Sequence, residues 1–159
     1  MAAKQLKTEK PDLELTLISR KKFATQLEFL LGEVFDHIIL LETKDFFSEQ
    51  SLVSARSKVH DFVSDLKKFE FDLVINLSFN KSSSYLTTLI SKELKMGLHR
   101  NTLGEVAIND KWSQFIYSNV MTGPLNPFNL VDIYKAISGA KETHLTNYEI
   151  PKSGLVTIH

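Results

Sequence analysis

The sequence contains no cysteine, which excludes disulfides, thiolate metal sites and a cysteine nucleophile. A chain without disulfides suits a reducing compartment. Its opening residues, MAAKQLKTEKPDLE, hold no apolar core of the kind found in secretion signals. We therefore expect a cytoplasmic protein.

Long hydrophobic runs and an excess of one charge are also missing. The longest apolar runs have about five residues, against the roughly 20 needed to span a bilayer. Lys and Arg together number 19, as do Asp and Glu, so the formal net charge is zero. This balance gives no reason to expect a nucleic-acid partner, and any contact with a membrane should be peripheral.

The common cofactor and metal motifs do not occur. There is no GxGxxG or GxxxxGKS phosphate cradle and no HExxH zinc motif. The five histidines are scattered without the spacing of metal ligands. We expect no bound cofactor and no metal, and no residue stands out as catalytic.

The chain does show short apolar runs that alternate with amphipathic stretches. The runs at residues 13–19, 37–42 and 71–78 predict strands. Helices are predicted at residues 21–32, 51–69, 84–96, 110–121 and 128–137, a strand or hairpin around residues 101–104, and a last strand at residues 155–158. This order predicts an α/β fold, a Rossmann-like parallel sheet with flanking helices.

One polar loop, residues 78–84, leaves a predicted strand and opens a predicted helix. Ligands of parallel sheets sit beyond the carboxyl ends of the strands, and free N–H groups at a helix start favour an anion. Ser78, Asn80, Lys81 and Ser82 could together bind sugar hydroxyls and a phosphate. The alternative is a run of helix caps beside a surface lysine.

Two arginines are weaker candidates for binding an anion. Arg20 follows the first predicted strand, and cations at a helix start oppose its dipole, so a nearby anionic ligand would explain their placement. Arg100 follows Gly97 and His99. The alternatives are a solvated helix start for Arg20 and a surface pair for His99 and Arg100.

Three phrases of the sequence resemble a known enzyme family. They are FDLVINLSFNKSSSYLTTLI, KMGLHR and KWSQFIYSNVMTGPLNPFNLVDIYKAISGA. The last contains an N-x-F-N-L-V-D-x-Y segment that begins at Asn126. Together they resemble the N-terminal domain of the lipopolysaccharide heptosyltransferases, glycosyltransferase family nine.

The resemblance implies a fold, a reaction and a location. Residues 1–150 would be the acceptor-side domain of a GT-B glycosyltransferase without its first strand. Residues 151–159 would be the linker and the first strand of a donor domain. The family transfers heptose from ADP-heptose to a lipid A–core acceptor at the cytoplasmic face of the inner membrane in Gram-negative bacteria.

The resemblance also implies which residues bind and what the chain lacks. Asn76, Ser78, Asn80, Lys81 and Ser82 would line the acceptor site, with Arg20 and Arg100 near acceptor phosphates. The family's catalytic aspartate and donor site match nothing here, so we expect no turnover from this chain alone. The alternative is a non-catalytic α/β binding or regulatory module that pairs with a partner chain.

A Rossmann-like sheet without its first strand would have a gap between the strands at residues 13–19 and 72–77. The flanking strands could close up, the tail strand at residues 155–158 could enter the gap, or two chains could exchange strands in a swapped homodimer. We expect the tail strand to enter the gap, within one chain or between two.

Overall fold

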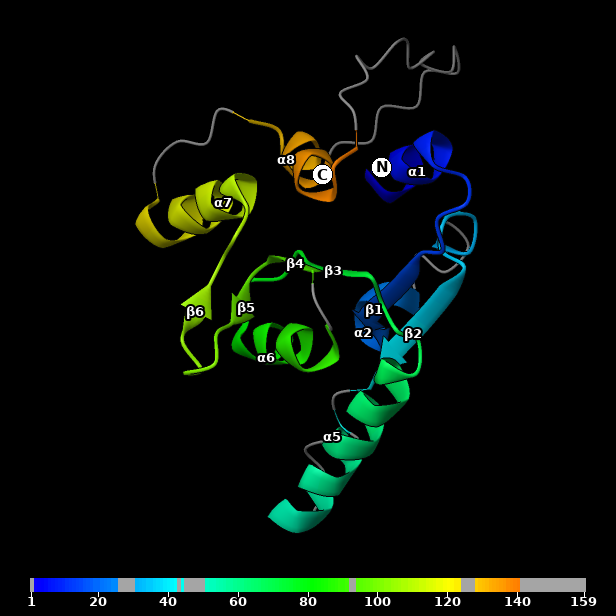
Figure 1. The fold of residues 1–159 in the computed structure, drawn as a ribbon, viewed down its shortest axis with the longest axis vertical. Coiled ribbons are helices and arrows are strands. Elements are labelled where there is room, and N and C mark those ends of the chain that lie inside the picture. The colour runs from blue at the N-terminus through cyan, green and yellow to red at the C-terminus, as the bar shows by residue number, and fades with distance from the viewer. Residues whose placement is uncertain are drawn as a thin grey trace.

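The computed structural model describes residues 2–25, 31–42, 44, 51–91, 94–123 and 128–140, and it is a mixed α/β fold (Figure 1). The helices are α1 (Ala2–Glu9), α2 (Lys21–Ala24), α5 (Leu52–Lys67), α6 (Lys81–Ile90), α7 (Lys111–Thr122) and α8 (Leu130–Ser138). The strands are β1 (Thr16–Arg20), β2 (His37–Leu41), β3 (Leu73–Asn76), β4 (Leu94–Gly97), β5 (His99–Arg100) and β6 (Val106–Ala107).

These strands form three separate pairs. β1 pairs with β2 and β3 with β4, both in parallel, whereas β5 and β6 form an antiparallel hairpin. Helices connect the parallel strands, because two parallel neighbours cannot be joined by a tight turn and need a longer crossover. Within the described residues no backbone hydrogen bond joins β1 to β3.

Two apolar clusters lie on opposite faces of the parallel strands. On one face Val63 and Leu66 of α5 and Ile90 of α6 are buried, with Val74 of β3 packed against them. On the other face Ile116, Ile133 and Ile137 of α7 and α8 are buried against the next strand residue, Ile75. Successive strand residues point to opposite faces, so helices cover β3 on both sides.

The first cluster also joins the two parallel pairs. Ile18 of β1 and Ile39 of β2 pack against the same α5 and α6 residues as Val74. β1, β2 and β3 therefore share one helix layer although β1 and β3 exchange no hydrogen bonds.

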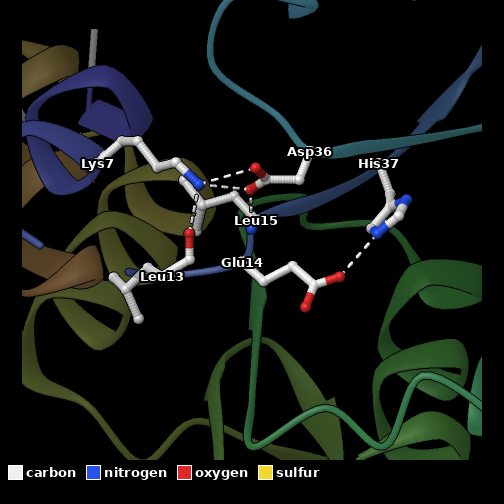
Figure 2. Close-up of polar contacts among 6 residues, drawn as sticks. All are labelled: Lys7, Leu13, Glu14, Leu15, Asp36 and His37. Carbon is white, nitrogen blue, oxygen red and sulfur yellow. Dashed lines mark hydrogen bonds and ion pairs between the residues drawn. The ribbon is translucent and has the colours of Figure 1, made fainter. Parts of the chain in front are cut away.

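Polar contacts fix α1 to the amino ends of β1 and β2 (Figure 2). The Lys7 ammonium lies 2.7 Å from the Asp36 carboxylate, which also accepts the Leu15 backbone N–H at 2.7 Å. This N–H, as the larger cause, and the Lys7 ammonium together hold the pKa of Asp36 below its ordinary value. Beside them His37 lies 2.7 Å from Glu14.

The predicted α/β class is confirmed, with strands shorter than predicted. β1 begins at Thr16 rather than residue 13, and β3 ends at Asn76 rather than residue 78. The Asn76 side chain accepts the Ser78 N–H at 2.9 Å, and this local turn ends the strand. The hairpin and the helices α5, α7 and α8 agree with the predicted segments within three residues at each end.

The helix predicted at residues 84–96 is wrong at both ends. α6 spans Lys81–Ile90, Ser91 is extended with ψ 131°, and β4 occupies Leu94–Gly97. Leu94 continues the helical spacing of Leu86 and Ile90. Pairing of β4 with β3 overrides that periodicity, as tertiary contacts often do.

Several predictions fall outside the described residues. These are the tail strand at residues 155–158, the linker assigned to residues 151–159, Asn126, and most of the second half of the helix predicted at 21–32. Of the helices that the structure describes, none is long and apolar enough to cross a membrane.

Candidate functional site

Asn76, the last residue of β3, organises the start of the polar loop. It is 8% exposed. Its Nδ2 donates to the Leu98 carbonyl at 2.6 Å and to Ser83 Oγ at 3.2 Å, while its Oδ1 accepts the Ser78 N–H. With its amide engaged on both sides, Asn76 positions the loop and has little capacity left for a ligand.

Asn80 caps α6. Its Oδ1 accepts the Ser83 N–H at 2.8 Å, and its Nδ2 donates to Ser78 Oγ at 2.5 Å. Ser83 Oγ donates in turn to the carbonyls of Asn80 and Ser78. The side chains of Ser78 and Asn80 are thus tied to one another, and the turn from β3 into α6 is held by its own hydrogen bonds.

Lys81 and Ser82, the first two residues of α6, lie exposed next to this turn. Within the described part of the chain neither side chain has a hydrogen-bond or ion-pair partner, and neither backbone N–H is taken by an acceptor. Two N–H groups, a hydroxyl and an ammonium group therefore face solvent at one helix start. This is a suitable set of donors for an anion.

Arg20 lies at the carboxyl end of β1 and is exposed. It is the N-cap of α2 but makes no side-chain cap hydrogen bond. Among the described residues no carboxylate pairs with it, whereas the neighbouring Lys21 lies 3.7 Å from Glu42. Arg20 thus follows β1 as the Ser78–Lys81 turn follows β3, although the two strands belong to separate hydrogen-bonded pairs.

Arg100 is half-buried and is held by contacts with α6 and with the turn of the β5–β6 hairpin. Its Nε donates to Ser84 Oγ at 2.9 Å and its Nη1 to the Gly104 carbonyl at 3.2 Å. Its guanidinium carbon lies 5.0 Å from the centre of the Tyr85 ring. These contacts attach the β5–β6 hairpin to α6, a structural role that leaves less of the side chain available for a phosphate.

Asp110 is a positioning residue that the sequence reasoning did not recognise. It caps α7 by accepting the Ser113 N–H at 2.7 Å, and its other oxygen accepts the Gly97 N–H at 2.9 Å. The signal was present, because an aspartate directly before an amphipathic run is typical of an N-cap. Asp110 therefore fixes the end of β4, next to Asn76.

The site contains donors and no evident base. Across the described residues, no three His, Asp or Glu side chains come together in a way that could hold a metal ion. Lys81, Ser82 and Arg20 are free to bind, whereas Asn76, Asn80, Ser78 and Arg100 are committed to the turn or the hairpin. The arrangement can bind and orient an anionic, hydroxyl-rich ligand.

Comparisons of the chain with protein-family models, with curated proteins and with solved structures found no match.

Proposed function

We propose that this chain is a Rossmann-like acceptor-binding domain of a heptosyltransferase-type GT-B glycosyltransferase. The sequence resemblance names the reaction. The parallel pairs, with helices on both faces, are compatible with such a domain. On this proposal the domain binds a phosphorylated core sugar, and the whole enzyme transfers heptose to it from ADP-heptose.

The observation that carries the proposal is the group of free donors at the start of α6. The N–H groups and side chains of Lys81 and Ser82 would bind an acceptor phosphate and a neighbouring hydroxyl. Arg20, at the carboxyl end of β1, would meet a second anionic group. Asn76, Asn80 and Ser78 would hold the turn in shape, so that these donors are oriented before the ligand arrives.

The proposed reaction of the whole enzyme is sugar transfer with inversion. A base removes the proton of the acceptor hydroxyl, whose oxygen attacks the anomeric carbon while ADP leaves with the electrons of the broken bond. None of the residues of this site is assigned the role of base. Their role is to place the acceptor, and a lipid-linked acceptor would bring the domain to the cytoplasmic face of the inner membrane.

Calorimetric titration with a phosphorylated core oligosaccharide tests the proposal. Lys81→Ala should weaken binding by about 1 kcal/mol or more, the scale of one charge-assisted hydrogen bond. The matched control is Lys67→Ala, which removes the same charge from the far end of α5, and it should bind as the unaltered chain does.

The phosphate supplies the second control of this titration. The dephosphorylated oligosaccharide should bind equally weakly to the unaltered chain and to Lys81→Ala. Equal affinity of these two proteins for the phosphorylated sugar would remove Lys81 from the site. Failure of the unaltered chain to distinguish the two sugars would remove the phosphate from the proposal.

The second candidate function is a binding module that pairs with a partner chain. Among the residues that the structure describes, one edge of β1 and one edge of β3 have no strand partner, and this favours the module because a free strand edge can accept a strand from another molecule. A complex that forms only through these edges, without sugar binding, would support the module instead.

A further inference from the structure

The apolar face of α5 is longer than the part of it that the fold buries. The buried residues of this helix, Val63 and Leu66, both lie in its carboxyl-terminal half. Toward the other end Val59 is 42% exposed and Leu52, the first residue of the helix, is 91% exposed. Figure 1 shows this amino-terminal half of α5 projecting beyond the other labelled elements. About three turns of α5 therefore carry apolar side chains that stay largely in contact with solvent.

The exposed residues continue the face that packs on the strands. Apolar side chains, called here the α5 stripe, follow one another along the helix at alternating steps of three and four residues: Leu52, Ala55, Val59, Phe62 and Leu66. The carboxyl-terminal end of this stripe packs against β1, β2 and β3. A repeat of seven residues with two apolar positions is the pattern by which one helix packs along another. The exposed part of the α5 stripe therefore has the form of a surface for a second helix.

Basic residues flank the exposed part of the α5 stripe. At about 100° per residue, Arg56 lies beside Leu52 on one flank and Lys58 lies beside Ala55 on the other. Both basic side chains are exposed. Asp61, the nearest carboxylate in the sequence of the helix, lies on the opposite face. A helix that packs on this part of the stripe would meet positive charge along both of its own flanks.

We propose that the exposed part of the α5 stripe is a docking surface for an amphipathic helix of another protein, with apolar residues at heptad spacing and acidic residues on both flanks. The acidic flanks would pair with Arg56 and Lys58, since charges beside a helix–helix seam decide which partners pair. None of these residues belongs to the candidate acceptor site, so this proposal does not depend on sugar binding.

A second copy of α5 would satisfy these flanks less well. In an antiparallel pair over the exposed part of the stripe, Arg56 and Lys58 would each face the same residue of the other copy. In a parallel pair they would face Ser51 and Val63, which supply no carboxylate. Both arrangements leave the basic flanks without a compensating charge, so the charges favour a different chain.

A lipid surface is also less suitable as the occupant. Helices that lie in a membrane interface bury a broad apolar face with large side chains such as Trp, Phe and Leu. The exposed part of the α5 stripe contains one Leu beside the smaller Ala55 and Val59, and only Val53, beyond Arg56, adds another exposed apolar side chain to this half. A narrow ridge of this kind fits the groove of another helix better than an acyl layer.

A pair of synthetic helices tests this surface. Each peptide has about three heptads with Leu at the apolar positions, and one carries Glu at the flanking positions where the other carries Lys. Fluorescence anisotropy should show that the unaltered chain binds the Glu peptide at least about tenfold more tightly than the Lys peptide. Equal affinity for the two peptides, or no binding of the Glu peptide, would overturn the proposal.

A charge swap locates the peptide on α5. The double variant Arg56→Glu, Lys58→Glu should reverse the preference, so that it binds the Lys peptide more tightly. The matched control is Lys4→Glu with Lys10→Glu, which makes the same change of charge on exposed residues near the start of the chain and should keep the preference for the Glu peptide. A preference that stays with the Glu peptide in the first variant, or that reverses in the control, would contradict docking on α5.

Removal of the apolar contact gives an independent readout. Leu52→Gln should weaken binding of the Glu peptide by about tenfold or more. The control is Leu103→Gln, which alters an 80%-exposed leucine in the turn of the β5–β6 hairpin and should leave the affinity unchanged. Because both leucines are exposed, both variants should keep the melting temperature of the unaltered chain. An equal effect of the two substitutions on binding would place the peptide elsewhere and rule out the α5 stripe.

Two further measurements separate the other occupants. The molar mass from sedimentation equilibrium, and flotation with vesicles of phosphatidylcholine and phosphatidylglycerol, should each be the same for the unaltered chain and Leu52→Gln. Dimers that Leu52→Gln abolishes would assign the surface to a second copy, and vesicle binding that it abolishes would assign the surface to an anionic membrane. Either result would overturn the docking of a helix from another protein.

Discussion

Among the described glycines, Gly97 is the one whose surroundings leave least room for a side chain. It ends β4 with φ +79°, and a Cβ there would lie 1.9 Å from the Asn76 backbone carbonyl oxygen. That carbonyl belongs to the strand paired with β4, so it cannot move aside without disturbing the pair. A glycine is therefore required both for the left-handed backbone and for the close approach.

Gly97→Ala should lower the free energy of unfolding by about 3 kcal/mol or more, through strain and the displaced strand. The control is Gly139→Ala, since Gly139 has φ +73° but open space around it. That variant should lose only about 1 kcal/mol. Urea unfolding measures both, and equal losses would show that the approach to Asn76 does not matter.

Asp36 should make the free energy of unfolding depend on pH in the acid range. Its pKa is lowered in the folded chain, first by the Leu15 N–H and then by Lys7, so ionised Asp36 favours the folded state. The advantage of the unaltered chain over Asp36→Asn should be complete above about pH 4, the ordinary pKa of aspartate. It should shrink as the pH falls further, through the lowered pKa.

The measurement for Asp36 is urea unfolding of both proteins at a series of pH values. A stability difference that shrinks toward low pH supports the Lys7, Leu15 and Asp36 contacts drawn in Figure 2. A difference that stays constant down to the acid limit of folding would show that these contacts do not form in solution.

At the level of elements, α6 depends on its cap. Asn80→Ala removes the acceptor of the Ser83 N–H and should cost about 1 kcal/mol of stability. The control is Ser82→Ala, two residues along the chain, because the Ser82 side chain has no partner among the described residues. This variant should change the free energy of unfolding by less than about 0.5 kcal/mol. Thermal or urea unfolding compares the two, and a Ser82→Ala loss as large as that of Asn80→Ala would contradict the cap.

Elements with a strong hydrophobic periodicity were predictable from the sequence. Elements that form only by pairing with another strand were not. α5 carries Val63 and Leu66 at the spacing of one buried face, and the structure buries both. β4 was missed because its four residues are too short to show a period, and only pairing with β3 makes them a strand. The polar segment at residues 78–84 does follow a strand and open a helix, but α6 already begins at Lys81, so its last four residues are helical rather than loop.

The roles within the site were harder to predict. Asn76, Asn80 and Arg100 look like ligand groups in the sequence, yet each is bonded to the fold. Whether a side chain is committed depends on neighbours far apart in sequence, such as Leu98 for Asn76 and Ser84 for Arg100. The side chains of Lys81 and Ser82 remain free because no described residue offers them a hydrogen-bond or ion-pair partner.

For the whole molecule, the described residues hold two parallel pairs that share a helix layer and exchange no strand hydrogen bonds with one another. The candidate ligand groups follow the carboxyl ends of β1 and β3, while the Lys7 and Asp36 contacts lie at the amino ends of β1 and β2. On the proposed function, ligand binding and structural support would be separated at opposite ends of the strands, as in open α/β sheets.

The most direct test of the account is an NMR titration of the ¹⁵N-labelled chain with a phosphorylated core oligosaccharide. The amide signals of Lys81 and Ser82, whose N–H groups are free, should shift most, together with Arg20, while those of Lys7 and Asp36 at the amino edge should not move. Shifts centred on the amino edge, or no shifts at millimolar sugar, would contradict an acceptor site at the carboxyl edge.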